Sequence, residues 1–66
     1  MLFNEKLRIA LAERKMTQEK LADILGLSRT AVNSYCNGRR EPSFDILKQI
    51  CIILDESADY LIGVKE

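Results

Sequence analysis

A set of polar side chains recurs at helical spacing between residues 28 and 38. The members are separated by intervals of one, four, five and eight residues from the first, which places them on one side of a helix. An arginine can bind guanine through two hydrogen bonds, and an asparagine can bind adenine in the same way. This face could therefore contact base edges, although polar residues opposite an apolar stripe also describe an ordinary solvated helix. The set consists of Arg29, Thr30, Asn33, Ser34 and Asn37.

Capping residues indicate that this face belongs to the second of two short helices. Thr17 and Ser28 each precede an apolar-periodic run, where a side-chain oxygen can accept from the free amide groups of a first helical turn. Gly26 and Gly38 stand where the runs stop, and glycine adopts the left-handed conformation that ends a helix without steric cost. Two capped helices joined by a tight turn predict a helix-turn-helix. The apolar stripes are Leu21, Ala22 and Leu25 in the first helix, and Val32, Tyr35 and Cys36 in the second.

Three further helices are expected around this motif. Asn4 can cap the first of them, Ser43 can cap a helix after Pro42, and Ser57 can cap a short last helix that Gly63 ends. A chain of 66 residues with 47% hydrophobic residues suits one compact all-α domain. The expected buried stripes are Phe3, Leu7, Ala10 and Leu11 near the start, and Leu47, Ile50, Cys51 and Leu54 after Ser43. The predicted domain spans residues 1–66, with helices over about 4–15, 18–25, 29–37, 44–54 and 58–62.

Positive charge gathers in one part of the chain although the whole chain is neutral. Ten basic and ten acidic residues cancel, so the strong basic excess of a typical nucleic-acid binder is missing. Residues 28–40 nevertheless carry Arg29, Arg39 and Arg40 and no acid, whereas residues 55–66 carry four acids and one lysine. This distribution permits binding to DNA, with modest nonspecific affinity and a shallow salt dependence.

The composition argues against several other classes of protein. No run approaches the roughly 18 apolar residues of a membrane span, and the start of the sequence lacks a secretory leader, so we expect a cytoplasmic protein with no membrane partner. The chain has no histidine, no glycine-rich phosphate loop and no paired nucleophile and base, which predicts no enzyme activity, no cofactor and no metal. Cys36 and Cys51 lie at apolar-stripe positions without Cys-x-x-Cys spacing, and we expect two buried free thiols.

Motifs spread over nearly the whole chain form one pattern. Thr-Gln followed by Leu-Ala and a Gly-x-Ser turn is weak alone, but Asn-Gly-Arg-Arg-x-Pro-Ser at the right distance makes the pattern specific. The residues that carry it are Leu7, Thr17 to Ala22, Gly26 to Ser28, Val32, Tyr35, Asn37 to Arg40, Pro42, Ser43, Leu47, Leu54, Ser57 and Asp59 to Gly63. With these residues the chain resembles the phage repressor and Cro family, the lambda-repressor-like helix-turn-helix domains of bacterial and phage regulators. The resemblance implies a compact five-helix, all-α fold.

The resemblance also implies a function and a set of contacts. Members of the family bind double-stranded DNA sequence-specifically and regulate transcription, reading the major groove with the helix expected here over residues 29–37. For three of the implied contacts there is an alternative without DNA. Asn37 could serve only to form the turn beside Gly38, and Arg39 and Arg40 could be a solvated pair. Gln18 would also brace the recognition helix. Base contacts are implied for Arg29, Thr30, Asn33 and Ser34, and phosphate contacts for Gln18, Ser28, Asn37, Arg39 and Arg40.

A single small module makes few base contacts, so we expect a homodimer on a near-palindromic operator with half-sites roughly 34 Å apart. The dimer surface is expected in the C-terminal helices, although the same apolar residues could simply complete the monomer core. The rival function is a protein–protein interaction module that keeps the fold without binding DNA, which the zero net charge favours. No small-molecule ligand is evident. The apolar residues in question are Ile46, Ile52, Ile53, Tyr60, Ile62 and Val64.

Two features depart from the family pattern. Many members carry an arginine at the position of Leu11 and a glutamate at the position of Cys36, which form a partly buried ion pair, and this chain has neither charge. Replacing both partners with apolar groups is often neutral or stabilising, so we expect Leu11 and Cys36 to touch in the core. Glu56 stands where the family usually has an apolar residue, which leaves the packing of the last two helices open.

Overall fold

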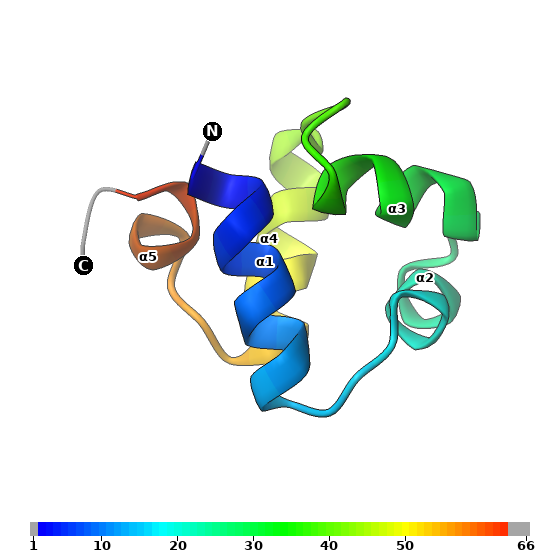
Figure 1. Ribbon diagram of the computed structural model, residues 1–66, viewed down its shortest axis with the longest axis horizontal. Helices are drawn as coiled ribbons and strands as arrows, with labels where there is room; N and C mark the ends of the chain where they lie inside the picture. Colours follow the sequence, from blue (N-terminus) through cyan, green and yellow to red (C-terminus); the bar gives the residue numbers. More distant parts are fainter. Residues whose placement is uncertain (1, 64–66) are drawn as a thin grey trace.

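Short turns connect the helices, and the longest helix, α1, runs through the middle of the molecule. The computed structural model describes residues 2–63 and contains, within them, five helices and no strand. Figure 1 shows α5 on one side of α1, and α2 and α3 on the other. None of these helices combines the length and the hydrophobicity that crossing a lipid bilayer requires. They are α1 (Leu2–Glu13), α2 (Gln18–Leu25), α3 (Arg29–Cys36), α4 (Phe44–Leu54) and α5 (Ala58–Ile62).

Hydroxyl caps fix where four of the helices begin. In each case the side-chain oxygen of the residue before the helix accepts from the backbone N–H three residues later, at 3.0 to 3.3 Å. The bounds of α2, α4 and α5 are those predicted from the sequence. Helix α3 ends at Cys36, one residue earlier than predicted, with Asn37 as its C-cap. The four hydroxyl caps are Thr17, Ser28, Ser43 and Ser57.

The first helix differs from its prediction at both ends. It begins at Leu2, so Asn4 lies inside the first turn and does not cap it, and its side chain instead packs against Gly38 in the turn after α3. The helix ends at Glu13 because Lys15 takes the left-handed conformation, with φ +53°. The N–H of Met16 then donates to the carbonyl of Leu11 at 2.9 Å, which closes the helix in a Schellman motif without a glycine.

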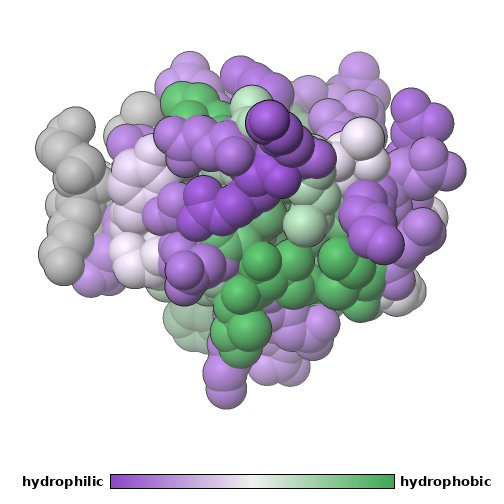
Figure 2. Space-filling view, turned by 90° about the horizontal axis from the view of Figure 1, so that it is seen from below, coloured by the Kyte–Doolittle hydropathy of each residue, from purple (hydrophilic) through white to green (hydrophobic). Residues whose placement is uncertain are grey.

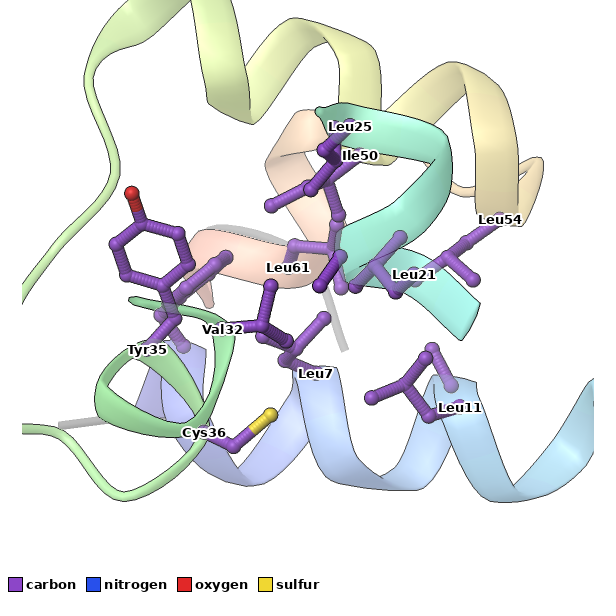
Figure 3. Close-up of a cluster of buried hydrophobic side chains, with 13 residues drawn as sticks. Leu7, Leu11, Leu21, Leu25, Val32, Tyr35, Cys36, Ile50, Leu54 and Leu61 are labelled. Atoms are coloured by element: carbon purple, nitrogen blue, oxygen red, sulfur yellow. The ribbon is translucent and has the colours of Figure 1, made fainter. Parts of the chain in front are cut away.

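Thirteen buried side chains form one core cluster between the helices (Figure 3). The cluster includes every residue predicted for the inward stripes of α1, α2 and α3. On α4, Ile50 and Leu54 are buried as predicted, but Leu47 and Cys51 are only half-buried because they pack against the cluster from its edge. The members are Phe3, Leu7, Ala10, Leu11, Leu21, Ala22, Leu25, Val32, Tyr35, Cys36, Ile50, Leu54 and Leu61.

Leu11 and Cys36, the two uncharged replacements, both belong to this cluster. Leu11 is 5% exposed and Cys36 is 1% exposed, so neither position leaves a buried polar group. Figure 3 shows them on either side of Leu7. The core therefore accommodates the loss of both charges, while direct contact between the two side chains stays a prediction.

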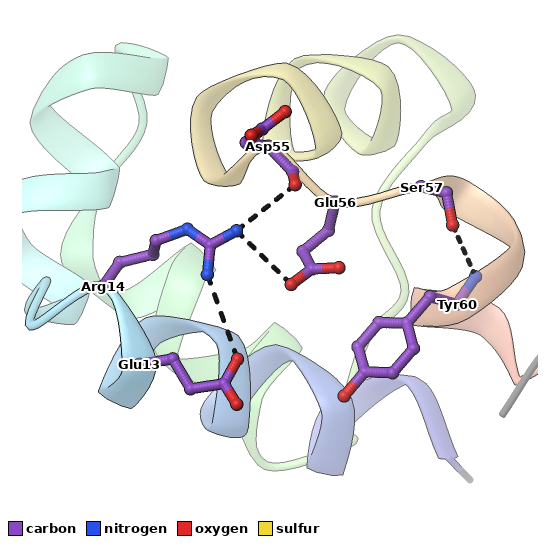
Figure 4. Close-up of polar contacts among 6 residues, drawn as sticks. All are labelled: Glu13, Arg14, Asp55, Glu56, Ser57 and Tyr60. Carbon is purple, nitrogen blue, oxygen red and sulfur yellow. Dashed lines mark hydrogen bonds and ion pairs between the residues drawn. The ribbon is translucent and has the colours of Figure 1, made fainter.

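Glu56 is half-buried, and its carboxylate forms an ion pair with the residue that follows α1. Arg14 follows α1, and its Nη2 lies 3.4 Å from the Glu56 carboxylate and 3.2 Å from the carbonyl oxygen of Asp55 (Figure 4). One guanidinium thus ties the end of α1 to the turn between α4 and α5. The Glu56 carboxylate thus has a cationic partner, and α4 and α5 are in contact despite the charge between them.

The left-handed Lys15 predicts a stabilising substitution. Lys15→Gly should raise the free energy of unfolding by about 0.5–1 kcal/mol, because a Cβ in the left-handed region collides with the following carbonyl oxygen. Urea denaturation measures this. The matched control is Lys15→Ala, which removes the same charge but keeps the Cβ and should leave stability close to that of the parent chain. Equal stability of the glycine and alanine variants would contradict the prediction.

Candidate nucleic-acid interface

Helix α3 buries one face and exposes the other. Its apolar residues, Ala31, Val32, Tyr35 and Cys36, are buried, and the helix packs against α1 and α2. Figure 1 shows α3 at the edge of the molecule, so its remaining face points outward. The side chains on that face are close together and accessible to a large ligand. Of the predicted base-reading residues, Arg29, Thr30 and Asn33 are exposed and Ser34 is half-buried.

The predicted phosphate-binding residues lie around this face, at the start of α2 and at the two ends of α3. Gln18 opens α2 and is half-buried, and the exposed Ser28 caps α3 with its hydroxyl, 3.1 Å from the N–H of Ala31. Beyond the other end of α3, Asn37, Arg39 and Arg40 are all exposed. The structure therefore brings the sequence-predicted residues together on one side of the helix-turn-helix.

A side-chain hydrogen bond joins the two helices of the motif. The Nδ2 of Asn33 donates to the Oε1 of Gln18 at 3.1 Å. Gln18 therefore braces α3, which is the contact that the family resemblance implied for it. Its partner on α3 is one of the residues predicted to read bases, and the sequence alone did not predict that pairing.

The turn after α3 is ordered by its own polar contacts. The Oδ1 of Asn37 accepts from the N–H of Arg39 at 3.2 Å, which is the turn chemistry considered as the alternative for Asn37. Gly38 has φ +81°, and the N–H of Arg39 also lies 3.0 Å from the carbonyl of Ser34. The guanidinium of Arg40 lies 5.8 Å from the centroid of the Tyr35 ring. This cation–π contact places Arg40 beside α3, while its side chain stays exposed to solvent.

Arg8 on α1 contacts the end of α3 and was not among the residues predicted from the sequence. Its Nη1 donates to the backbone carbonyl of Cys36. The last carbonyls of a helix lack intrahelical partners and carry partial negative charge, so a guanidinium there is favourable. Arg8 thus supplies a polar link between α1 and α3, two helices that many family members join through the ion pair absent here. The sequence pattern gave no signal for this contact, because it depends on how α1 packs against the end of α3.

The cysteines are free thiols, and they differ in burial. Cys36 is buried, as predicted, but Cys51 is only half-buried. Burial raises the pKa of the Cys36 thiol, and the nearby charge of Arg8 opposes that rise. Burial also raises the pKa of Cys51. Among residues 2–63, no three His, Cys, Asp or Glu side chains are grouped so that they could hold a metal ion.

Comparison with known proteins identifies the family. The family described as Helix-turn-helix matches residues 7–61 of this chain. The chain belongs to the helix-turn-helix family. This membership confirms the resemblance found in the sequence, and the five helices confirm the predicted all-α, lambda-repressor-like fold class.

Several curated helix-turn-helix proteins are similar to this chain. It is 43% identical over 61 residues to YqaE of Bacillus subtilis (strain 168), an uncharacterized HTH-type transcriptional regulator, covering 92% of this chain and 53% of the relative. It is 36% identical over 66 residues to BcrR of Enterococcus faecalis, an HTH-type transcriptional activator, covering 100% of this chain and 32% of the relative. A prophage-derived regulator of B. subtilis, YonR, is 31% identical over 61 residues, covering 92% of this chain and 56% of the relative. The chain thus spans about half the length of two of these helix-turn-helix relatives and a third of the other.

The link from Arg8 to α3 predicts a loss of stability on substitution. Arg8→Ala should lower the free energy of unfolding by about 1 kcal/mol, because the Cys36 carbonyl loses a charged donor and the helix end loses its cation. Thermal and urea unfolding measure the change. Lys20→Ala removes an equal charge from an exposed site on α2 and should have little effect. If both variants lose the same stability, the contact contributes nothing specific.

Proposed function

We propose that this chain binds double-stranded DNA sequence-specifically and regulates transcription, reading the major groove with the exposed face of α3. The observation that carries the proposal is the orientation of that helix. Its apolar stripe is buried against the rest of the domain, and the side that carries Arg29, Thr30 and Asn33 is exposed. The relatives YqaE and BcrR are described as transcriptional regulators, which supports the same function. Its place of action would be the cytoplasm of a bacterium, where the DNA lies.

The proposed contacts divide into those that read bases and those that hold the backbone. Arg29 and Thr30 open α3, and the first residues of a recognition helix are those that meet base edges in the major groove. Ser34 lies on the same side one turn later. Phosphate contacts fix the register of the protein on the duplex but carry no sequence information. We assign them to Gln18, Ser28, Asn37, Arg39 and Arg40.

The net charge of the chain bears on the strength of DNA binding and on the second candidate function. Because ten acidic residues balance ten basic ones, nonspecific attraction to DNA rests on the few arginines of the interface and should be modest. The same neutrality favours the second candidate function, a protein–protein interaction module that keeps the fold without binding DNA. The two candidates differ in their response to duplex DNA at low salt.

A homodimer on a near-palindromic site is part of the proposal. Of the residues expected to form the dimer surface, Ile46, Ile53 and Tyr60 pack against the core, so they complete the monomer. Ile52 is 70% exposed and Ile62 is 43% exposed, which leaves both available to a second copy. Val64 lies outside the described residues.

Other exposed apolar side chains support an interaction surface on the C-terminal half. Phe44, at the start of α4, is 88% exposed. Ile62 borders a small hollow that Phe3, Pro42 and Leu47 also line. Figure 2 shows a further group of apolar side chains on the face seen from below, which is the side away from the start of α4 in Figure 1. Surfaces of this kind commonly mark contacts between proteins.

Binding to random duplex DNA tests the proposed function. The affinity should be measurable at low salt and should fall as salt rises, with a slope that reflects only a few phosphate contacts. No detectable binding at low salt would reject DNA binding in favour of the interaction module. Selection from a random duplex library should then return near-palindromes with half-sites roughly 34 Å apart. Sites without symmetry would argue against the homodimer.

Arginine substitutions test the division between base and phosphate contacts. Arg29→Ala should cost roughly 1 to 3 kcal/mol of binding free energy at the selected site and relax the preference at one base pair. Arg39→Ala or Arg40→Ala should instead weaken binding to all sequences alike. Affinities for the selected and a scrambled duplex, measured in parallel, separate the two patterns. A loss confined to one sequence in the Arg40 variant would overturn the assignment.

A further inference from the structure

Three side-chain amides form a continuous chain of hydrogen bonds across the helix-turn-helix. It starts in the turn after α3, where the Oδ1 of Asn37 accepts from the N–H of Arg39 at 3.2 Å. The Nδ2 of Asn37 donates to the Oδ1 of Asn33 at 3.1 Å, one turn back along α3. The Nδ2 of Asn33 donates to the Oε1 of Gln18 on α2 at 3.1 Å. We call this chain, from Arg39 through Asn37 and Asn33 to Gln18, the amide relay.

The relay has a direction that a single backbone group determines. The N–H of Arg39, which also donates to the carbonyl of Ser34 at 3.0 Å, can only donate, so the amide of Asn37 turns its oxygen and not its nitrogen toward it. The nitrogen of Asn37 then faces Asn33, and the nitrogen of Asn33 in turn faces Gln18. The oxygen of the Gln18 amide thereby accepts from Asn33. The nitrogen of that amide, Nε2, is the end of the relay and keeps two N–H groups to donate.

We infer that the amide relay aims the Nε2 of Gln18 at a DNA phosphate, and that Asn33 is a positioning residue rather than a reader of bases. This inference rests on the proposed function. Phosphate oxygens only accept hydrogen bonds, so a glutamine must present its nitrogen and not its oxygen to them. An amide fixed in that orientation before binding also loses less rotational freedom when the complex forms.

The same contacts oppose the base-reading role that the family resemblance implied for Asn33. Reading adenine through two hydrogen bonds requires both the nitrogen and the oxygen of an asparagine amide to point into the groove together. Here the two ends of the Asn33 amide are directed in different ways, the nitrogen toward α2 and the oxygen toward Asn37. Turning the amide toward a base would break both hydrogen bonds. Base reading therefore falls to Arg29, Thr30 and Ser34.

Alanine substitutions separate positioning from base reading. Asn33→Ala should weaken binding roughly 3- to 10-fold, by similar factors on the selected and the scrambled duplex, because the lost hydrogen bond serves a phosphate contact. Gln18→Ala should have the same pattern. The double variant should bind no more weakly than the weaker single variant, because both changes remove one contact. Thr30→Ala, on the same face but outside the relay, is the matched control, and any loss there should depend on sequence.

A measurement on the free protein tests the relay without DNA. Nitrogen-15 relaxation of the side-chain amides should show a restricted Gln18 Nε2 in the parent chain and a mobile one in Asn33→Ala. Three results would overturn the inference while DNA binding stands. They are a loss confined to one base pair in Asn33→Ala, additive losses in the double variant, and an equally mobile Gln18 in both proteins. Failure of the parent chain to bind duplex DNA at low salt would instead reject the proposed function.

Discussion

The burial of one stripe of α3 is the constraint on which the rest of the arrangement depends. Side chains leave a helix at fixed angles, so burying Val32, Tyr35 and Cys36 leaves one rotation of the helix about its axis and turns Arg29 and Thr30 outward. The core around the stripe is closely packed, and such packing resists rotation of the helix because it would open cavities. The polar contacts act on this fixed helix. Arg8 holds its last carbonyl, and Gln18 holds its middle.

The sequence was sufficient to predict a helix start or end where a capping side chain or a glycine determines the backbone conformation. Thr17 and Ser28 determine the starts of α2 and α3, and Gly26, with φ +71°, ends α2, so those bounds followed from single residues. The end of α1 did not, because a lysine carries the left-handed conformation there. What favours that turn is tertiary: Met16, three residues beyond the helix end, packs against the core cluster that contains Leu11. Asn4 is not a cap because the helix begins two residues before it, at Leu2.

The members of the candidate interface were predictable from the sequence, but their contacts with one another were not. Helical spacing and family resemblance placed Arg29 and Asn33 on the outward face, because a period of 3.6 residues needs no knowledge of neighbours. The pairing of Asn33 with Gln18, 15 residues away, depends on how α2 and α3 cross. The contact of Arg8 with the carbonyl of Cys36, 28 residues away, depends on how α1 meets the end of α3. Residues so far apart in the sequence meet only because the helices pack together, and the sequence pattern does not specify how the helices pack.

The buried thiol of Cys36 has a consequence for chemical modification. Alkylating reagents and oxidants attack the thiolate, and burial raises the pKa of this thiol while keeping it 1% exposed. A reagent can therefore reach the sulfur only when α3 separates from α1 and the core opens. Cys51, half-buried on α4, is more accessible in the closed protein. The slower of the two modification rates in one sample thus measures how often α3 separates from the core.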